Sequence, residues 1–185
     1  MTEIRVATPD DAAAFAAIYA PIVTSTHTSF EERAPSAGEM RTRIEKTLAW
    51  TPWIAAIEGG VIVGYAYASR HRERPAYRWA VDVSVYLDER ARGRGIGRAL
   101  YERLLAILRQ QGFRHAYAGI ALPNDASVAL HRAVGFEPVG VYRRVGWKAG
   151  KWYDVAWFGC DIGDVHGEEQ PAEPIPFAAI VLSPP

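Results

Sequence analysis

A glycine- and arginine-rich turn is the clearest candidate for chemistry in this sequence. It reads Arg92-Gly93-Arg94-Gly95-Ile96-Gly97 and lies between a predicted strand and a predicted helix. The first N–H groups of a helix have no internal partner and carry partial positive charge, and glycine lets a ligand approach the backbone closely. The first helical turn, through Arg98, contains no acid that would repel an anion. The turn therefore predicts a site for a phosphate-bearing ligand.

Two well-known phosphate motifs do not fit this turn. A Rossmann site has its glycine-rich turn near the N-terminus, with an acid roughly 20 residues further on, and a P-loop has a lysine. The turn follows several predicted strands and lacks both features. A different phosphate ligand is expected, and a solvated turn without function is the alternative.

Asp82 is the candidate general base. It lies on a predicted strand, residues 80–87, whose other members are Ala, Val, Ser, Tyr and Leu, and it comes shortly before the glycine turn. Burial of a carboxyl group raises its pKa toward values that suit proton abstraction. The alternative is a structural acid paired with Arg72, Arg74 or Arg78.

Two other side chains could take part in proton or acyl transfer. His131 lies on a predicted short helix, where an imidazole can exchange protons near neutral pH, although a lone helical histidine is often structural. Cys160 is the only cysteine and has no basic partner near it in sequence, so we interpret it as a buried apolar thiol. A single cysteine also excludes an intrachain disulfide and a cysteine-based metal cage, and no metal site is predicted.

Periodicity indicates the elements that must position these residues. Strands are predicted near residues 4–6, 53–57, 61–67, 80–87, 115–121, 139–143 and 152–160. Helices are predicted to begin near Thr8, Ser36, Ile96 and Pro123. This mixture predicts an α/β (α+β) layer fold with a mixed, largely antiparallel central sheet flanked by helices. Residues 1–163 are expected to form one domain, and the proline-rich tail, 164–185, to lie on the surface or be partly disordered.

The composition narrows the possible partners. The 185 residues carry 21 basic and 21 acidic side chains, a formal net charge of zero, which gives no electrostatic reason to expect a nucleic acid or an anionic membrane. No apolar run approaches the roughly 20 residues of a membrane span. The first residues lack the pattern of a signal peptide, so a cytoplasmic protein is expected.

Two segments together resemble a known superfamily. The first is Arg92-x-x-Gly95-x-Gly97, and the second is Asn124-x-x-Ser127-x-x-Leu130-His131-x-x-Val134-Gly135-Phe136. Their order and separation resemble the two landmarks of the GNAT superfamily of N-acetyltransferases. Further motifs resemble the phosphinothricin and methionine sulfone (sulfoximine) N-acetyltransferases: Ala76-Tyr77-Arg78-Trp79, Leu122-Pro123-Asn124-Asp125, Gly146-Trp147-Lys148-x-Gly150-Lys151-Trp152-x-Asp154-Val155, and Thr24-Ser25-Thr26 with Phe30. The similarity runs from about residue 4 to residue 161.

The resemblance implies a GNAT-type fold and direct acetyl transfer from acetyl-CoA to an amine within a ternary complex, without an acyl-enzyme. Asp82 occupies the place of a glutamate in the subfamily. Because its carboxylate is about one carbon–carbon bond further back, a water is expected to bridge it to the amine. His131 stands where many members carry a tyrosine that returns a proton to the CoA thiolate. The expected cofactor-binding residues are Val83, Val85, Arg92, Gly93, Arg94, Gly95, Ile96, Gly97, Arg98, Asn124 and Ser127.

The same resemblance implies a small amino-acid-like substrate and a homodimer with sites near the interface. The expected substrate-binding residues are Phe30, Arg72, Arg74 and Tyr77. Guanidinium groups suit bidentate capture of a carboxylate, although a solvated basic loop is the alternative. Lys148, Lys151 and Trp152 are expected to close a wall of the site or to form a dimer contact.

Two other functions stay open at this point. One is acetylation of a protein N-terminus or another amine, which an open groove would favour over a closed pocket. The other is a non-catalytic sensor that binds acyl-CoA. A sensor has no reason to keep titratable groups at both Asp82 and His131, although Asp in place of Glu leaves room for it.

Overall fold

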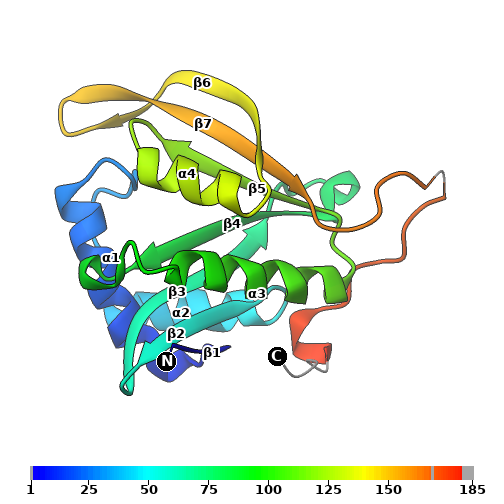
Figure 1. Ribbon diagram of the computed structural model, residues 1–185, viewed down its shortest axis with the longest axis horizontal. Helices are drawn as coiled ribbons and strands as arrows, with labels where there is room; N and C mark the ends of the chain where they lie inside the picture. Colours follow the sequence, from blue (N-terminus) through cyan, green and yellow to red (C-terminus); the bar gives the residue numbers. More distant parts are fainter. Residues whose placement is uncertain (1, 168, 181–185) are drawn as a thin grey trace.

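A seven-stranded sheet in the order β1-β2-β3-β4-β5-β7-β6 forms the centre of the computed structural model, which describes residues 2–167 and 169–180 (Figure 1). Its strands are β1 (Glu3–Val6), β2 (Trp53–Glu58), β3 (Val61–Arg70), β4 (Ala80–Leu87), β5 (His115–Ala121), β6 (Glu137–Lys148) and β7 (Lys151–Asp161). Five of the neighbouring pairs in this described sheet are antiparallel, and only β4 and β5 run parallel. The predicted mixed, largely antiparallel sheet is confirmed.

The β4–β5 pair is short, and this fact shapes the molecule. The two strands pair only at Ala80 with His115, Val81 with Ala116, and Asp82 with Tyr117. Beyond Asp82 the strands diverge, although β4 continues to Leu87. The backbone N–H and C=O groups that face the gap are therefore not used in a β4–β5 ladder.

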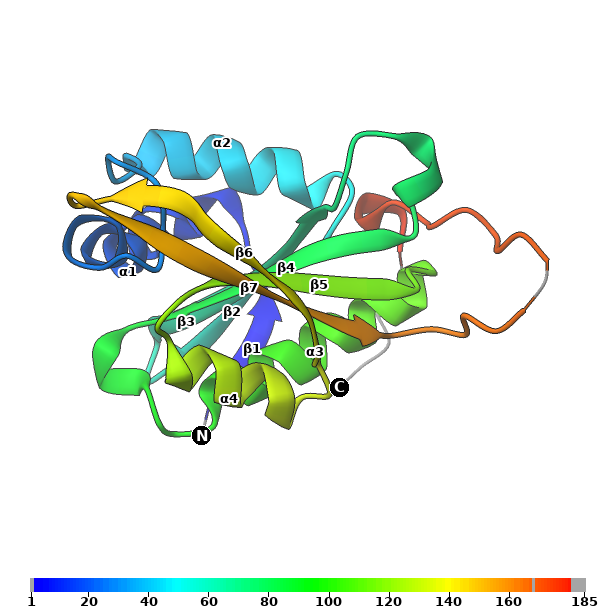
Figure 2. The ribbon, with the colours of Figure 1, turned by 90° about the horizontal axis from the view of Figure 1, so that it is seen from above.

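Four helices of the described chain cover the two faces of the sheet (Figure 2). Helices α1 (Ala12–Ser25) and α2 (Ala37–Leu48) pack on the face that carries Trp53, Ala55 and Tyr65. Helices α3 (Ile96–Gln111) and α4 (Asp125–Ala133) lie on the opposite face, where Val81 and Val83 join the larger core. Alternation along each strand divides its side chains between two apolar layers.

Local sequence explains how two helices begin. Pro9–Asp11 forms a 3-10 turn before α1 rather than its first α-helical turn. At α2 the Ser36 hydroxyl accepts a hydrogen bond from the Glu39 N–H at 3.2 Å, and the Glu39 carboxylate accepts one from the Ser36 N–H at 2.7 Å. The predicted capping box is confirmed.

The β6–β7 hairpin is longer than predicted. Alternation was legible only over residues 139–143 and 152–160, whereas the observed strands continue to Lys148 and begin again at Lys151. A register shift between Tyr142 and Gly146, with Arg144 at a φ of 49°, interrupts the alternation and explains the shortened prediction.

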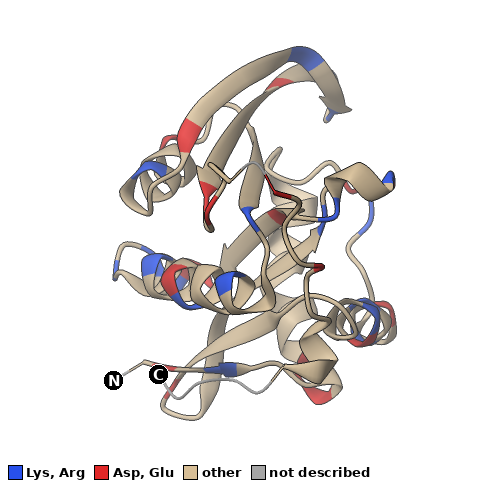
Figure 3. Cartoon of the chain, turned by 90° about the vertical axis from the view of Figure 1, so that its right-hand side faces the viewer, with Lys and Arg blue, Asp and Glu red and all other residues tan. Residues whose placement is uncertain are grey.

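In the view of Figure 3, acidic and basic residues are interspersed over the chain.

The C-terminal tail is partly anchored rather than wholly at the surface. Phe177 is buried against the α3 core, and its N–H donates to the Trp50 carbonyl at 3.1 Å. The Gln111 amide group donates to the carbonyls of Trp50 and Ile175, each at 2.8 Å. Surface placement was thus wrong for Phe177, because the end of α3 offers a polar anchor beside an apolar hollow. Residue 168 and residues 181–185 lie outside the described residues.

Candidate active site

A cavity of about 550 Å³ opens where β4 and β5 diverge; we call it the central cleft. It is lined by β4 from Val83 to Leu87, by β5 from Ala118 to Ala121, by the turn before α3, and by the first turns of α4. Thr26 and Thr28, which follow α1, also line it. Segments far apart in sequence therefore meet around one cavity.

The turn before α3 has the geometry of an anion cradle. Gly93 and Gly95 have φ values of +71° and +82°, which side chains rarely adopt, and a Cβ at either would meet nothing within 4 Å. Gly95 is the N-cap of α3 and supplies no side-chain cap, and the first turn contains no acid. The first N–H groups of α3 are thus left to a ligand.

The neighbouring glycine serves packing. A Cβ at Gly97 would lie 3.1 Å from Leu130 Cδ2, so this glycine lets α4 approach α3 closely. The three glycines of the turn therefore do two different jobs. Gly93 and Gly95 set the backbone conformation, and Gly97 sets the distance between two helices.

Most of the predicted cofactor-binding residues line the cleft together. They are Val83, Val85, Arg92, Gly93, Gly95, Ile96, Gly97, Arg98, Asn124 and Ser127. Arg94 is the exception among the predicted set, because it pairs with Glu58 at 2.8 Å and is not part of the lining. Arg98 also pairs with Glu102 at 2.7 Å.

Asn124 caps α4, as its position before the helix predicted. Its Oδ1 accepts a hydrogen bond from the Ser127 N–H at 3.1 Å. The cap holds the start of α4 at the wall of the cleft, so one residue both begins the helix and lines the cavity.

Asp82 lies at the point where the strands part and pairs with a histidine. His71 Nδ1 is 2.6 Å from Asp82 Oδ1, and the His71 ring stacks on Tyr117 with centroids 4.7 Å apart. Burial raises the pKa of Asp82, while the hydrogen bond and charge of His71 and the charge of Arg72 partly offset the rise. The next residue, Val83, lines the cleft, and Asp82 itself is not part of the lining.

His71 is a site residue that sequence reasoning missed. The predicted structural partners of Asp82 were arginines, and a histidine makes the contact instead. Ser69 pairs with Asp82 in the β3–β4 ladder, so a residue two positions beyond Ser69 falls diagonally across from Asp82 on the same face. The strand register, had it been known, would have identified His71.

His131 is buried at the wall of the cleft and is bonded on both nitrogens. Its Nδ1 lies 2.7 Å from the Ser127 carbonyl, which can only accept, so Nδ1 carries the hydrogen. Nε2 then accepts the hydroxyl hydrogen of Tyr101 at 2.9 Å. Burial lowers the pKa of His131, although the hydrogen bond to Ser127 opposes this, and the ring is neutral at neutral pH. Tyr101, which also lines the cleft, was missed because only the packing of α3 on α4 brings it to His131.

The predicted substrate-binding residues fall into two groups outside the cleft lining. Arg72 donates to the His71 carbonyl at 2.8 Å and lies over the Trp157 ring at 5.7 Å, and Tyr77 meets the His71 ring edge-on at 6.0 Å. Arg74, just before a 3-10 turn at Pro75–Tyr77, is exposed.

Phe30 belongs to the other group. It packs against Gly146 of β6, where an added Cβ would lie 2.1 Å from the Phe30 ring, and it lies 6.4 Å from the Tyr153 ring. The structure therefore brings Arg72 and Tyr77 to the Asp82–His71 pair and places Phe30 against the hairpin.

Cys160 lies away from the cleft lining. Burial raises the pKa of its thiol, and Sγ lies 3.5 Å from the Asp161 carbonyl. A thiol in this environment is a poor nucleophile. Within the described residues, no group of three or more His, Cys, Asp or Glu side chains is placed to hold a metal ion. None of the described helices combines the length and apolar character that crossing a membrane requires.

Comparison with known proteins finds relatives along nearly the whole chain. Residues 4–157 match the family described as acetyltransferase (GNAT) domain. A phosphinothricin N-acetyltransferase of Streptomyces viridochromogenes is 37% identical over 178 residues, which cover 96% of this chain and 94% of that protein. An L-methionine sulfoximine/L-methionine sulfone acetyltransferase of Salmonella typhimurium is 33% identical over 155 residues, covering 83% of this chain and 91% of the relative.

A solved structure is similar over the same range. It is a GNAT superfamily phosphinothricin acetyltransferase of Sinorhizobium meliloti in complex with AcCoA. Its TM-score is 0.88 and its sequence identity 36%, over 94% of this chain and 95% of that one.

Proposed function

The chain belongs to the GNAT acetyltransferase family, and from that premise we propose that it transfers the acetyl group of acetyl-CoA to the amino group of a small amino-acid-like substrate. The observation that carries the proposal is the central cleft. It has a cradle of left-handed glycines at one end and the Asp82–His71 pair beside the other. The match of residues 4–157 to the GNAT acetyltransferase family confirms the resemblance inferred from the sequence motifs.

The groups that line the cleft suit the successive parts of acetyl-CoA. The free N–H groups of α3, with Arg92 and Arg98, would hold the pyrophosphate. The unpaired edges of β4 at Val83 and Val85 would bind the amide groups of the pantetheine arm, with Asn124 across from them. Acetyl-CoA supplies the acyl group as a reactive thioester.

Asp82 is proposed as the general base. An amine is protonated at neutral pH, and Asp82 would accept that proton so that the nitrogen lone pair can attack the acetyl carbon. Asp82 lies beside the cleft rather than in its lining, which supports transfer through one bridging water. The raised pKa of Asp82 makes its carboxylate a stronger base than an ordinary aspartate and so better suited to take a proton from the amine.

Tyr101 and His131 are proposed to serve the leaving group. As the new C–N bond forms and the C–S bond breaks, the nitrogen loses its second proton and the thiolate gains one. Tyr101, hydrogen-bonded to His131 at the wall of the cleft, can give its hydroxyl hydrogen to the sulfur. The second proton of the nitrogen then passes through water to the Tyr101–His131 pair, so the pair ends the reaction as it began. The proton taken by Asp82 leaves to solvent, so the reaction balances without an acyl-enzyme.

The substrate is proposed to carry a carboxylate near its amine. Arg72, Arg74 and Tyr77 lie on the segment that leads into β4, and guanidinium groups bind carboxylates in a bidentate manner. Phosphinothricin and methionine sulfone or sulfoximine, named for the relatives, are the first molecules to test. Phe30 is proposed to line the substrate pocket from the hairpin side.

A homodimer is proposed through the β6–β7 hairpin. β6 is an edge strand, and exposed apolar side chains gather on this hairpin: Val139, Val141, Tyr142, Val145, Trp147 and Trp152. Such a patch favours a protein interface. Sedimentation should give a dimer that Val141→Lys disrupts.

Because acetyl-CoA is an intracellular metabolite, we also propose a cytoplasmic location.

The test of the proposed function is steady-state release of the CoA thiol. Phosphinothricin, methionine sulfone, methionine sulfoximine and the common free amino acids are each tried with acetyl-CoA. At least one should give a kcat/KM of about 10⁴ M⁻¹s⁻¹ or above. Binding of acetyl-CoA without turnover of any small amine would overturn the small-molecule function and favour a protein substrate or an acyl-CoA sensor.

A further inference from the structure

The segment between α1 and α2, residues 26–36, crosses from one half of the molecule to the other; we call it the crossing loop. It follows α1, which packs on the β2–β4 half of the sheet, and it reaches the β6–β7 hairpin. Thr26 and Thr28 line the cleft. The loop follows α1 on the face of the sheet where Tyr86 packs, and alternation along β4 places Asp82 on that same face. The opening of the cleft on this face is what we call its amine end, and the position of the crossing loop sets its width.

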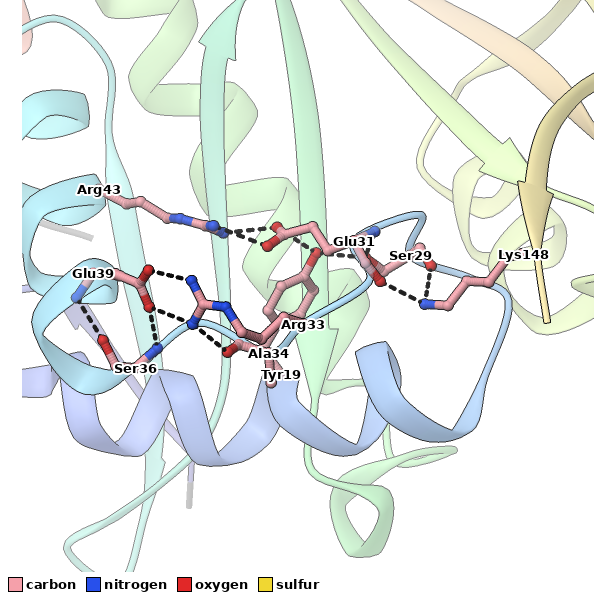
Figure 4. Close-up of polar contacts among 9 residues, drawn as sticks. All are labelled: Tyr19, Ser29, Glu31, Arg33, Ala34, Ser36, Glu39, Arg43 and Lys148. Atoms are coloured by element: carbon pink, nitrogen blue, oxygen red, sulfur yellow. Dashed lines mark hydrogen bonds and ion pairs between the residues drawn. The ribbon is translucent and has the colours of Figure 1, made fainter.

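Lys148, the last residue of β6, holds the crossing loop by three hydrogen bonds. Its Nζ donates to the carbonyls of Ser29 at 2.5 Å and Glu31 at 2.8 Å (Figure 4). It also donates to the carbonyl of Val23 at 2.6 Å. An ammonium group has three donors, and all three are used. The Val23 carbonyl belongs to the last turn of α1, where carbonyls lack helical partners and the dipole favours a cation. The distant hairpin thus supplies the C-terminal cap of α1.

The same loop is fixed from its other side. The Glu31 carboxylate accepts two hydrogen bonds from Arg43 of α2, at 2.7 and 2.9 Å, and one from the Tyr19 hydroxyl at 3.0 Å (Figure 4). Hydrogen bonding to Arg43 lowers the pKa of Glu31, so the carboxylate stays charged. The loop is therefore firmly attached to α1 and α2, and Lys148 is the charged group that joins this assembly to the hairpin.

Two ring contacts and one polar contact accompany the Lys148 bonds. The His27 ring stacks on Tyr153 of β7 with centroids 4.5 Å apart, and its Nε2 lies 3.0 Å from the Pro123 carbonyl. Phe30 occupies the space above Gly146, two residues before Lys148. Through these contacts the crossing loop, which is attached to α1 and α2, is joined to the β6–β7 hairpin and to the segment after β5. They span the cleft between β4 and β5.

We propose that Lys148 is a positioning residue that clasps the cleft shut at its amine end and so sets the affinity for the amine substrate. The two halves of the sheet are joined by three β4–β5 pairs on one side of the cleft, and the Lys148 clasp joins them on the other. Without the clasp, the crossing loop leaves the hairpin and the amine site widens. The inference rests on the proposed function and adds a residue that does not touch the reacting atoms.

The decisive measurement separates two Michaelis constants. Lys148→Met keeps the length of the side chain and removes its donors, so the KM for the amine should rise about 10-fold or more, the loss expected for hydrogen bonds to a charged group. The KM for acetyl-CoA should change less than about 3-fold, since the cradle at α3 supplies most of its binding. Lys148→Arg keeps the charge and should recover most of the loss.

Lys46→Met is the matched control, because Lys46 is an exposed lysine of α2. It should leave both constants unchanged. Equal rises of both constants in Lys148→Met, or no rise in either, would overturn the clasp while leaving the acetyltransferase function standing. Calorimetric binding of acetyl-CoA to each variant shows that it has folded.

A second measurement needs no activity. The chain has only three lysines, Lys46, Lys148 and Lys151, so reductive methylation with ¹³C-formaldehyde gives three lysine signals. Lys148 of the wild type should react at least about 10-fold more slowly than Lys46, because its ammonium must first break its three hydrogen bonds. Equal rates would refute the clasp even if no amine substrate had been found.

Discussion

The two ends of the central cleft are built in opposite ways. The proposed phosphate cradle is one contiguous turn, residues 92–98, in which backbone N–H groups and two left-handed glycines provide most of the geometry. The proposed amine end combines side chains from four separate segments: the crossing loop, the connection from His71 to Tyr77, Asp82 on β4, and Lys148 on β6. A site made from local backbone is set by a short motif, whereas a site made from distant side chains is set by strand register.

The largest effect should come from removing the proposed base. Asp82→Asn should lower kcat/KM by about 10²–10⁴-fold, the usual contribution of a general base, and leave the affinity for acetyl-CoA unchanged. The matched control is Asp161→Asn, because Asp161 also pairs with a histidine, His115 at 2.9 Å, but away from the cleft lining. An equal loss of acetyl-CoA binding in Asp82→Asn would show that the two ends are not independent.

A glycine substitution tests the other end. Gly95→Ala forces a side chain onto a φ of +82°, which should raise the KM for acetyl-CoA about 10-fold because the cradle must change shape. Gly60→Ala imposes the same strain, at a φ of +80° with equally open space, in the turn between β2 and β3. Both variants should lose about 1 kcal/mol of unfolding free energy, and only Gly95→Ala should bind acetyl-CoA more weakly. Parallel losses of binding would assign the effect to general stability.

The pH dependence of the amine end should move when His71 is replaced. Burial raises the pKa of Asp82, and His71 partly offsets that rise, so removing His71 raises the pKa further. As the proposed base, Asp82 acts as the carboxylate, so the reaction rate should be lost as the pH falls through the pKa of Asp82. The acid limb of kcat/KM in His71→Phe, which can still stack on Tyr117, should therefore shift to higher pH. An unchanged limb would show that another group titrates, since the amine's own titration is common to both proteins.

The tail should give the smallest effect on either end of the cleft. Phe177→Ala removes a buried ring and should lower the unfolding free energy by about 3 kcal/mol, yet both Michaelis constants should stay within about 2-fold at 25 °C. Urea denaturation combined with steady-state kinetics checks both statements. A selective change in the KM for the amine would show that the tail affects the amine end, and the tail could then not serve as a control region for the cleft.

The sequence predicted the fold well because most helices and strands are indicated by patterns within their own residues. Alternation identified β4 and placed Asp82 on the face opposite to Val81 and Val83, and the Ser36–Glu39 pattern located the start of α2. The glycine turn was equally legible, because positive φ and an uncapped helix start are properties of a few adjacent residues. The extent of the hairpin was missed where a bulge at Arg144 breaks the alternation.

The contacts that complete the candidate site were not predictable in the same way. The His71–Asp82 pair depends on the β3–β4 register, and the Tyr101–His131 bond depends on how α3 packs on α4. Lys148 contacts carbonyls more than a hundred positions earlier in the chain. Each partner looks ordinary in its own segment, so only the assembled structure reveals what it bonds to.

Because the β4–β5 ladder is short, backbone N–H and C=O groups beyond it lack strand partners, and a ligand can pair with them. Past Asp82, the amides of two neighbouring strands face each other across the cleft without a ladder between them. If the pantetheine arm lies there, as proposed, it acts as a substitute strand. The amides of Val83 and Val85 should then exchange their hydrogens with solvent far more slowly once acetyl-CoA is bound. Completing the sheet would thus couple cofactor loading to the rigidity of the protein's centre.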